Sequence, residues 1–155
     1  CLAVPLYEQL ELLKKNKVAV VCGILSGTLA SLTGIFVLCM LFGFNHQQYV
    51  TMLPKSITTA IGIGISEELG GIVTITVAVI IITGILGNVI ADTVFHIFKI
   101  KNPLAKGLAL GTASHAIGTA RAIEMGPVEG AMSSLAVAVA GLLTVVFVSG
   151  FAQLI

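Results

Sequence analysis

Long apolar runs without a charged residue alternate with short polar connections along this chain. Asp, Glu, Lys and Arg are absent from residues 18–54 and from residues 70–91. Three runs, 18–44, 72–98 and 131–155, each supply the ~20 apolar residues that a membrane-spanning helix needs. The pattern therefore predicts three spanning helices.

Two segments between these runs, 56–71 and 107–126, are rich in Gly, Ser and Thr, and the first is too short for a comfortable span. The spacing favours an internal repeat, 56–98 and 107–151, of the kind that builds many transporters. With an offset of 56 residues, the matching stretches are Ala60–Gly62 with Ala116–Gly118, Glu68 with Glu124, and Gly70 with Gly126. A chance match in so biased a composition is the alternative.

The composition of the chain, together with this pattern, predicts its fold class. Hydrophobic residues make up 57% of the 155 residues and charged residues only 10%, which excludes a soluble globular domain. We expect an all-α integral membrane protein, a polytopic helical bundle that forms one membrane domain over residues 1–155. The net charge of +1 comes without a basic cluster or an aromatic platform, so nucleic acid is not an expected partner.

Lysine placement constrains the path of the chain. Lysines at 14–17 and at 99–106 should both lie on the inner side of the membrane. Both can do so only if segment 56–71 enters and leaves on the same side. We therefore predict two broken or re-entrant segments that meet from opposite faces as an inverted pair and line a substrate path. Lys55, expected on the outer side, argues mildly against this orientation.

Arg121 and His115 are the candidate residues for attracting an anion. Charged residues in the hydrocarbon layer cost about 2.5 kcal/mol or more, so they tend to face a cavity or a partner. A helix break near Gly118 would let both side chains face one cavity. The alternatives are an ion pair of Arg121 with Glu124, three residues on, and a histidine that is only hydrogen-bonded.

Hydroxyl groups in both short segments could hold a carboxylate, although bonding between helices is an equally good interpretation. Glu68 and Glu124 are candidates for ion coupling, with helix caps and ion pairs as the alternative. The small residues Gly23, Gly27 and Ser31 recur every fourth position, which is typical of close helix packing. The candidate hydroxyl groups belong to Ser56, Thr58, Thr59, Thr112, Ser114 and Thr119.

No catalytic, metal or cofactor site is expected. The cysteines lack CxxC spacing, and the histidines lie on separate segments without ligand spacing. A membrane enzyme would need a nucleophile or metal set that these residues do not supply. The residues concerned are Cys1, Cys22, Cys39, His46, His96 and His115.

Two stretches, "LPKSITTAIGIGISEELGGI" at 53–72 and "KGLALGTASHAIGTARAIEMGPVEGAMSSLAVAVAGLLT" at 106–144, resemble the LrgB/CidB family, and the resemblance extends along essentially the whole chain. It implies a multi-pass protein of the bacterial inner membrane, an antiholin-like or holin-like regulator of murein hydrolase activity and autolysis. It also implies a small membrane partner of the LrgA/CidA type. Plastid relatives are glycolate/glycerate translocators, and bacterial pairs have been linked to pyruvate uptake.

Members of that family are longer at the N-terminus, so we expect this chain to be the C-terminal part of a longer one. Ala60 stands where many members have a proline, which predicts a straighter helix there. Two functions follow. The first is a carrier of small monocarboxylates such as pyruvate or glycolate. The second is an oligomeric pore or regulatory protein that controls lysis with its partner.

Overall fold

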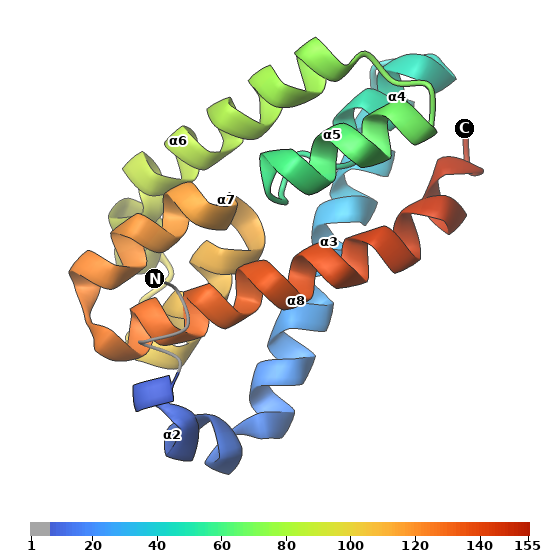
Figure 1. Ribbon diagram of the computed structural model, residues 1–155. Coiled ribbons are helices and arrows are strands. Elements are labelled where there is room, and N and C mark those ends of the chain that lie inside the picture. Colours follow the sequence, from blue (N-terminus) through green and yellow to red (C-terminus); the bar gives the residue numbers. More distant parts are fainter. Residues whose placement is uncertain (1–6) are drawn as a thin grey trace.

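The computed structural model describes residues 7–155, which form helices joined by short turns and contain no strand (Figure 1). Cys1 lies outside the described residues. The all-α prediction is confirmed for this part of the chain. The helices are α2 (Leu10–Lys15), α3 (Lys17–Leu41), α4 (His46–Met52), α5 (Thr59–Glu68), α6 (Val73–Ile97), α7 (Pro103–Met125) and α8 (Pro127–Ala152).

Three helices, α3, α6 and α8, are long and apolar enough to cross a membrane, with mean hydropathies of 2.1, 2.4 and 2.4. They coincide with the three predicted runs, because continuous apolar sequence can satisfy its backbone only as a helix in lipid. The third helix begins at Pro127 rather than at Ala131. Proline suits the first turn of a helix, where its missing N–H group leaves no hydrogen bond unmade.

Helices α4 and α5 form the first hairpin, residues 46–68, whose tip spans residues 53–58. The two ends of this hairpin lie together: the Gln47 side chain donates to the Gly70 carbonyl at 3.3 Å, and the Ile72 amide donates to Thr51 Oγ1 at 2.9 Å. Figure 1 shows both ends beside the C-terminal end of α3. The hairpin therefore enters and returns at one end of the bundle. The segment predicted to do so, 56–71, contains only the tip and the returning helix, because α4 forms the entering arm.

Residues 45–55 are one of the short polar connections between the apolar runs, yet His46–Met52 within them form helix α4. Asn45 caps the helix by accepting from the Gln48 amide at 2.9 Å, and the Gln48 side chain accepts from the Asn45 amide at 3.0 Å. This reciprocal capping stabilises a short, polar helix start. Helix α4 ends at Met52, two residues before Pro54. Pro54 therefore supplies a break in this segment, although Ala60 stands where many family members have a proline.

Helix α7 is the second hairpin, with arms 103–114 and 116–125. His115 interrupts it with φ 42° and ψ −138°, outside helical values. The arms pack together, since a Cβ on Gly118 would lie 2.9 Å from the carbonyl oxygen of Leu110. The predicted break is therefore real but lies at His115 instead of Gly118.

The two hairpins enter from opposite ends of the bundle. Ser56 at the first tip bonds to Ser31, near the middle of α3, with 2.9 Å between the hydroxyl oxygens. At the second tip, His115 Nε2 lies 2.9 Å from the carbonyl oxygen of Ile80, and the Asn88 side chain donates to the Ile117 carbonyl at 3.3 Å. A hairpin followed by a long helix thus occurs twice, in α4–α6 and in α7–α8.

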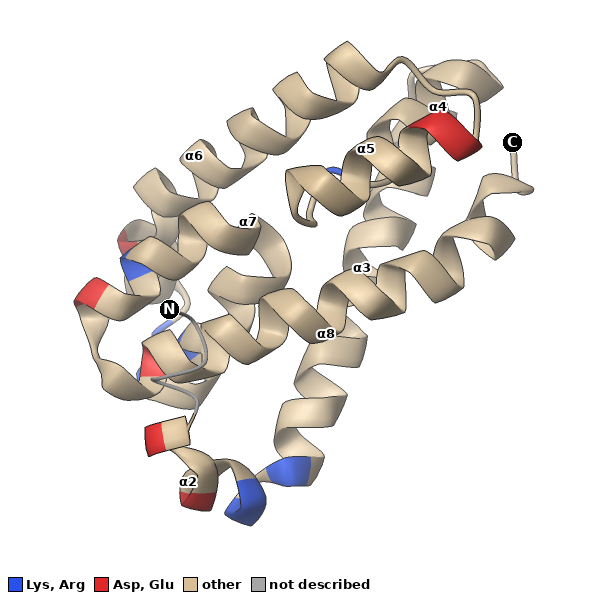
Figure 2. Cartoon of the chain, in the orientation of Figure 1, with Lys and Arg blue, Asp and Glu red and all other residues tan. Residues whose placement is uncertain are grey.

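Charge is distributed unevenly over the bundle. Most blue and red segments gather at the end that holds α2 and the start of α8, and the middle is almost entirely tan (Figure 2). The two lysine groups, 14–17 and 99–106, both lie toward this end, next to the mouth of a cavity lined by Asn16 and Asn102. Their shared placement agrees with the path predicted from the lysines.

Candidate functional site

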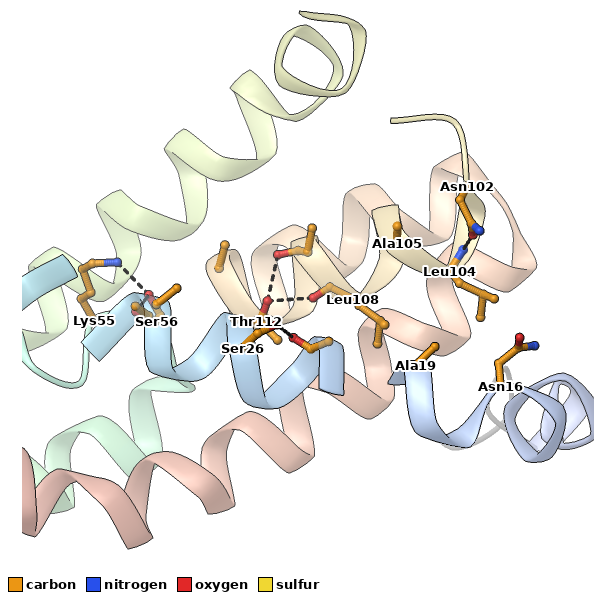
Figure 3. Close-up of a pocket in the computed structure, with 16 residues that line it drawn as sticks. Asn16, Ala19, Ser26, Lys55, Ser56, Asn102, Leu104, Ala105, Leu108 and Thr112 are labelled. Carbon is orange, nitrogen blue, oxygen red and sulfur yellow. Dashed lines mark hydrogen bonds between the residues drawn. The ribbon is translucent and has the colours of Figure 1, made fainter. Parts of the chain in front are cut away.

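A cavity of about 780 Å³ lies between α3, the first arm of α7 and the tip of the first hairpin (Figure 3). Asn16 and Asn102 line its mouth, at the beginnings of α3 and α7. Lys55, Ser56 and Thr112 line its inner end. The cavity therefore extends from one end of the bundle to about half the length of α3.

Small side chains make this cavity possible. Its walls include Gly23, Gly27, Ala30 and Ala109, so α3 and α7 approach closely while space remains beside them. A Cβ on Gly27 would lie 2.8 Å from Thr112 Oγ1. The small-residue pattern of α3 thus faces α7 of the same chain.

The inner end of the cavity is a polar cluster around the first tip. The Lys55 ammonium donates to Ser56 Oγ at 2.8 Å, and the Ser31 hydroxyl donates to the same oxygen at 2.9 Å. Because Ser56 accepts both bonds, its own hydroxyl proton is free for a ligand, as are two N–H groups of Lys55. The cluster offers three donors to an anion.

Lys55 has no acidic partner in the described part of the chain, where every salt bridge involves Arg121. No Asp or Glu lines the cavity. A half-buried ammonium among apolar helices is costly without a counter-charge. The positive charge at the inner end is therefore available to an anion that enters through the mouth.

Thr112 presents a different group to the cavity. Its hydroxyl donates to the carbonyl of Leu108 at 2.8 Å, which leaves a lone pair of Oγ1 free to accept. Ser56 and Thr112 are 56 positions apart, which is the offset of the predicted repeat. Each hairpin thus contributes one hydroxyl group from the same relative position.

Beyond these hydroxyl groups the passage closes. A second cavity of only about 10 Å³, room for about one water molecule, lies between Leu32, Leu53, Ile57 and Thr144. Leu32, Leu53 and Ile57 belong to a buried apolar cluster. The large cavity is therefore closed at its inner end by apolar side chains.

Arg121 and His115, predicted to hold the anion together, lie apart from this cavity. Arg121 forms ion pairs with Asp92 and, at 2.7 Å, with Glu124. His115 is buried against α6, where its ring bonds to the Ile80 carbonyl. The ion pair with Glu124 is the alternative that the sequence analysis weighed, and an anion-binding role for either residue stays a prediction.

The other candidate hydroxyl groups lie outside the cavity lining. Ser114 packs against Gly87 of α6, and Thr119 bonds to Ser133 of α8 with 2.8 Å between the oxygens. Thr58 and Thr59 begin α5. Glu68 ends the same helix and is exposed. Among residues 7–155, no three His, Cys, Asp or Glu side chains gather into a group that could hold a metal.

Lys55 was not among the predicted binding residues, because the sequence analysis placed it on the outer side of the membrane. The structure places it near the level of Ser31, about halfway along α3. The sequence carries one signal for this placement. Pro54 and Lys55 directly precede segment 56–71, which the lysine rule predicts to be re-entrant, and a proline ends a helix there.

Comparison with known proteins finds relatives along nearly the whole chain. The model of the LrgB-like family matches residues 1–154. The chain is 40% identical over 153 residues to the antiholin-like protein LrgB of Bacillus subtilis (strain 168), covering 99% of this chain and 66% of that protein. It is 42% identical over 149 residues to the antiholin-like protein LrgB of Bacillus cereus (strain B4264), covering 96% and 65%. The chain thus spans about two thirds of the length of these relatives. No solved structure matches.

Proposed function

The chain belongs to the LrgB-like family, and on that premise we propose that it carries small monocarboxylates, such as pyruvate or glycolate, across the bacterial inner membrane. The observation that carries this proposal is the ammonium of Lys55, which forms no salt bridge among residues 7–155 and lies at the closed inner end of the large cavity. A carrier needs such a charge at mid-depth to attract an anion. No catalytic residue or cofactor is part of the proposal.

The substrate carboxylate binds at Lys55 and Ser56, where the free donors are a pair of ammonium N–H groups and a hydroxyl. Thr112 faces the same cavity as an acceptor, which suits the hydroxyl of a 2-hydroxy acid. Most of the remaining lining residues are Gly, Ala or Ser, with Leu104 and Leu108 as the larger apolar side chains. The site therefore favours a short acid with one small polar substituent.

Transport requires the sealed end to open while the mouth closes. Leu32, Leu53 and Ile57 form the seal, and two of these three residues belong to the first tip. A shift of that hairpin against α3 would open the seal and move Lys55 with the bound anion. The two hairpins are accordingly the moving elements of the carrier, one for each face.

The test is uptake of labelled pyruvate, glycolate and lactate into vesicles that contain the full-length protein with its LrgA/CidA-type partner. We expect Lys55→Ala to lower uptake at least tenfold, and Lys55→Arg to retain more of it because the charge remains. Lys14→Ala, which changes a lysine outside the cavity, is the control. Unchanged uptake in Lys55→Ala would refute the site.

Arg121→Ala separates this site from the one predicted from the sequence. If Arg121 only holds Asp92 and Glu124, uptake per folded molecule should stay near that of the unchanged protein. A complete loss of uptake at normal protein levels would instead assign the anion to Arg121.

The names of the relatives support a second function, that of an antiholin-like regulator. Such a regulator would act as an oligomeric pore or through a holin-like partner. Leakage of a small dye from the same vesicles distinguishes it from a carrier. Leakage without saturable uptake would favour the regulator. A variant in the small-residue pattern, Gly27→Leu, would not distinguish the two functions. Gly27 packs against Thr112 of the same chain, so the larger side chain would disturb the cavity whichever function the protein has.

A further inference from the structure

A third pocket, of about 550 Å³, lies where α6 ends and α7 begins and shares no lining residue with the proposed transport cavity. Three lysines and one histidine line it against a single acid, Asp92, which is paired with Arg121. Within residues 7–155, none of these lysines forms a salt bridge. The pocket therefore has a strong uncompensated positive charge. Its basic residues are His96, Lys99, Lys101 and Lys106.

Lys99 occupies a backbone position that normally favours glycine. It has φ 53° at the end of α6, where the Ile100 amide donates to the Phe95 carbonyl at 2.8 Å. Helices α3 and α5 end in the same hydrogen-bonding pattern, but with Gly43 and Gly70 at the equivalent position. A left-handed non-glycine residue costs stability and tends to persist where function requires it.

A second lysine is positioned by an aromatic ring. The ammonium of Lys106 lies 5.8 Å from the centroid of the Phe95 ring, a cation–π geometry. Phe95 is buried and lines the pocket, so it holds Lys106 over the pocket instead of leaving it free in solvent. Two cations thus converge on one space from α6 and α7.

The surroundings of the pocket indicate what kind of anion binds there. Ile97 and Phe98, beside Lys99, are 66% and 72% exposed, and they end a helix long enough to span the membrane. A ligand at this end of α6 meets charge on one side and an apolar helix surface on the other. That combination matches a phospholipid, whose phosphate and acyl chains are joined in one molecule.

We propose that this pocket, lined by Lys99, Lys101 and Lys106, binds the headgroup of an anionic phospholipid. The phosphodiester lies among the three ammonium groups, and the acyl chains lie along the exposed apolar face of α6. His96 adds a hydrogen-bond donor or acceptor at the edge. The proposal is independent of the transported substrate, because the pocket shares no lining residue with the large cavity.

The test is thermal unfolding of the full-length protein in neutral detergent, with added dioleoyl phosphatidylglycerol or dioleoyl phosphatidylcholine. We expect phosphatidylglycerol to raise the melting temperature by several degrees, an effect that weakens at high salt, and phosphatidylcholine to have little effect. The variant Lys99→Gln/Lys101→Gln/Lys106→Gln should lose this rise. Lys14→Gln/Lys15→Gln, in α2 near Glu11, is the control and should keep it.

Lys99→Gly gives a decisive second readout, because glycine relieves the backbone strain. It should melt at a higher temperature than the unchanged protein without lipid, yet gain less from phosphatidylglycerol. An equal gain in all variants would overturn the pocket assignment, and so would the absence of any gain. Glycerophosphoglycerol, which has the same phosphodiester without the acyl chains, should give no comparable rise. An equal rise would mean that the pocket takes a free anion instead of a lipid.

Discussion

At the scale of single residues, the charge of a side chain does not by itself identify an anion-binding group. The presence or absence of acidic partners distinguishes the candidates. Arg121 and Lys55 are both rare cations in apolar sequence, but only Arg121 has acidic partners. One of them, Asp92, is 29 positions away in the sequence and belongs to another helix. No spacing rule reveals that pairing, whereas the pair with Glu124 follows from helix periodicity.

The bond between Thr119 and Ser133 is a residue-scale test of whether the buried hydroxyl groups serve packing or substrate. Both side chains are buried. Thr119→Val should cost about 1–3 kcal/mol of unfolding free energy, because Ser133 loses its partner without access to water. Thr119→Val/Ser133→Ala should recover part of that loss. Chemical unfolding in detergent measures both.

A different outcome would reassign Thr119. If Thr119→Val left stability unchanged but abolished uptake, the hydroxyl would serve the substrate, as the sequence analysis proposed as one alternative.

At the scale of helices, the sequence predicts the helices that depend on the length of an apolar run. It does not predict the helix breaks that depend on contacts between distant residues. The three long helices follow from uninterrupted hydrophobic runs. The break in α7 does not follow in the same way, since Gly118 has the freer backbone but His115 adopts the non-helical angles. The bond from the His115 ring to the Ile80 carbonyl holds the break, and it joins residues 35 positions apart.

The contact between α7 and α8 gives an element-scale prediction. A Cβ on Gly111 would lie 2.5 Å from the backbone carbonyl oxygen of Ser133, which cannot move aside cheaply. Gly111→Ala should therefore destabilise the protein by about 1–3 kcal/mol. Gly34→Ala, in α3 with no neighbour within 4 Å, is the matched control and should stabilise by up to about 1 kcal/mol. Unfolding of the two variants side by side measures the difference, and equal effects would contradict the close packing.

At the scale of the whole molecule, the described chain is a bundle whose large cavity is closed at one end by apolar side chains. Three apolar clusters fill the bundle. They are built around Tyr49 and Leu53, around Ile24 and Met132, and around Phe95 and Ala122. The polar contacts of Ser31, Ser56 and Thr112 lie between the first two. The internal repeat itself stays a prediction, although the order of elements and the positions of Ser56 and Thr112 agree with it.

This asymmetry predicts one-sided labelling. In a background without native cysteines, Ala30→Cys and Ala105→Cys in the cavity wall should react with a membrane-impermeant thiol reagent only from the side of the cavity mouth. Leu53→Cys, in the seal, should be protected from both sides. A short monocarboxylate should slow the labelling of Ala30→Cys. Labelling of Leu53→Cys at the same rate would mean that the passage is not closed.

The tips of the two hairpins also constrain how the protein is made. The non-helical backbone of a hairpin tip inside the membrane cannot be exposed to lipid, because its unpaired N–H and C=O groups need protein partners. The first hairpin is synthesised before α6, yet Ser66 of α5 bonds to Thr76 of α6 with 2.8 Å between the oxygens. During translation this hairpin must therefore wait near the membrane surface until α6 has been inserted. When the second hairpin is synthesised, α6 has already been inserted but α8 has not. The order of synthesis therefore delays the insertion of both hairpins.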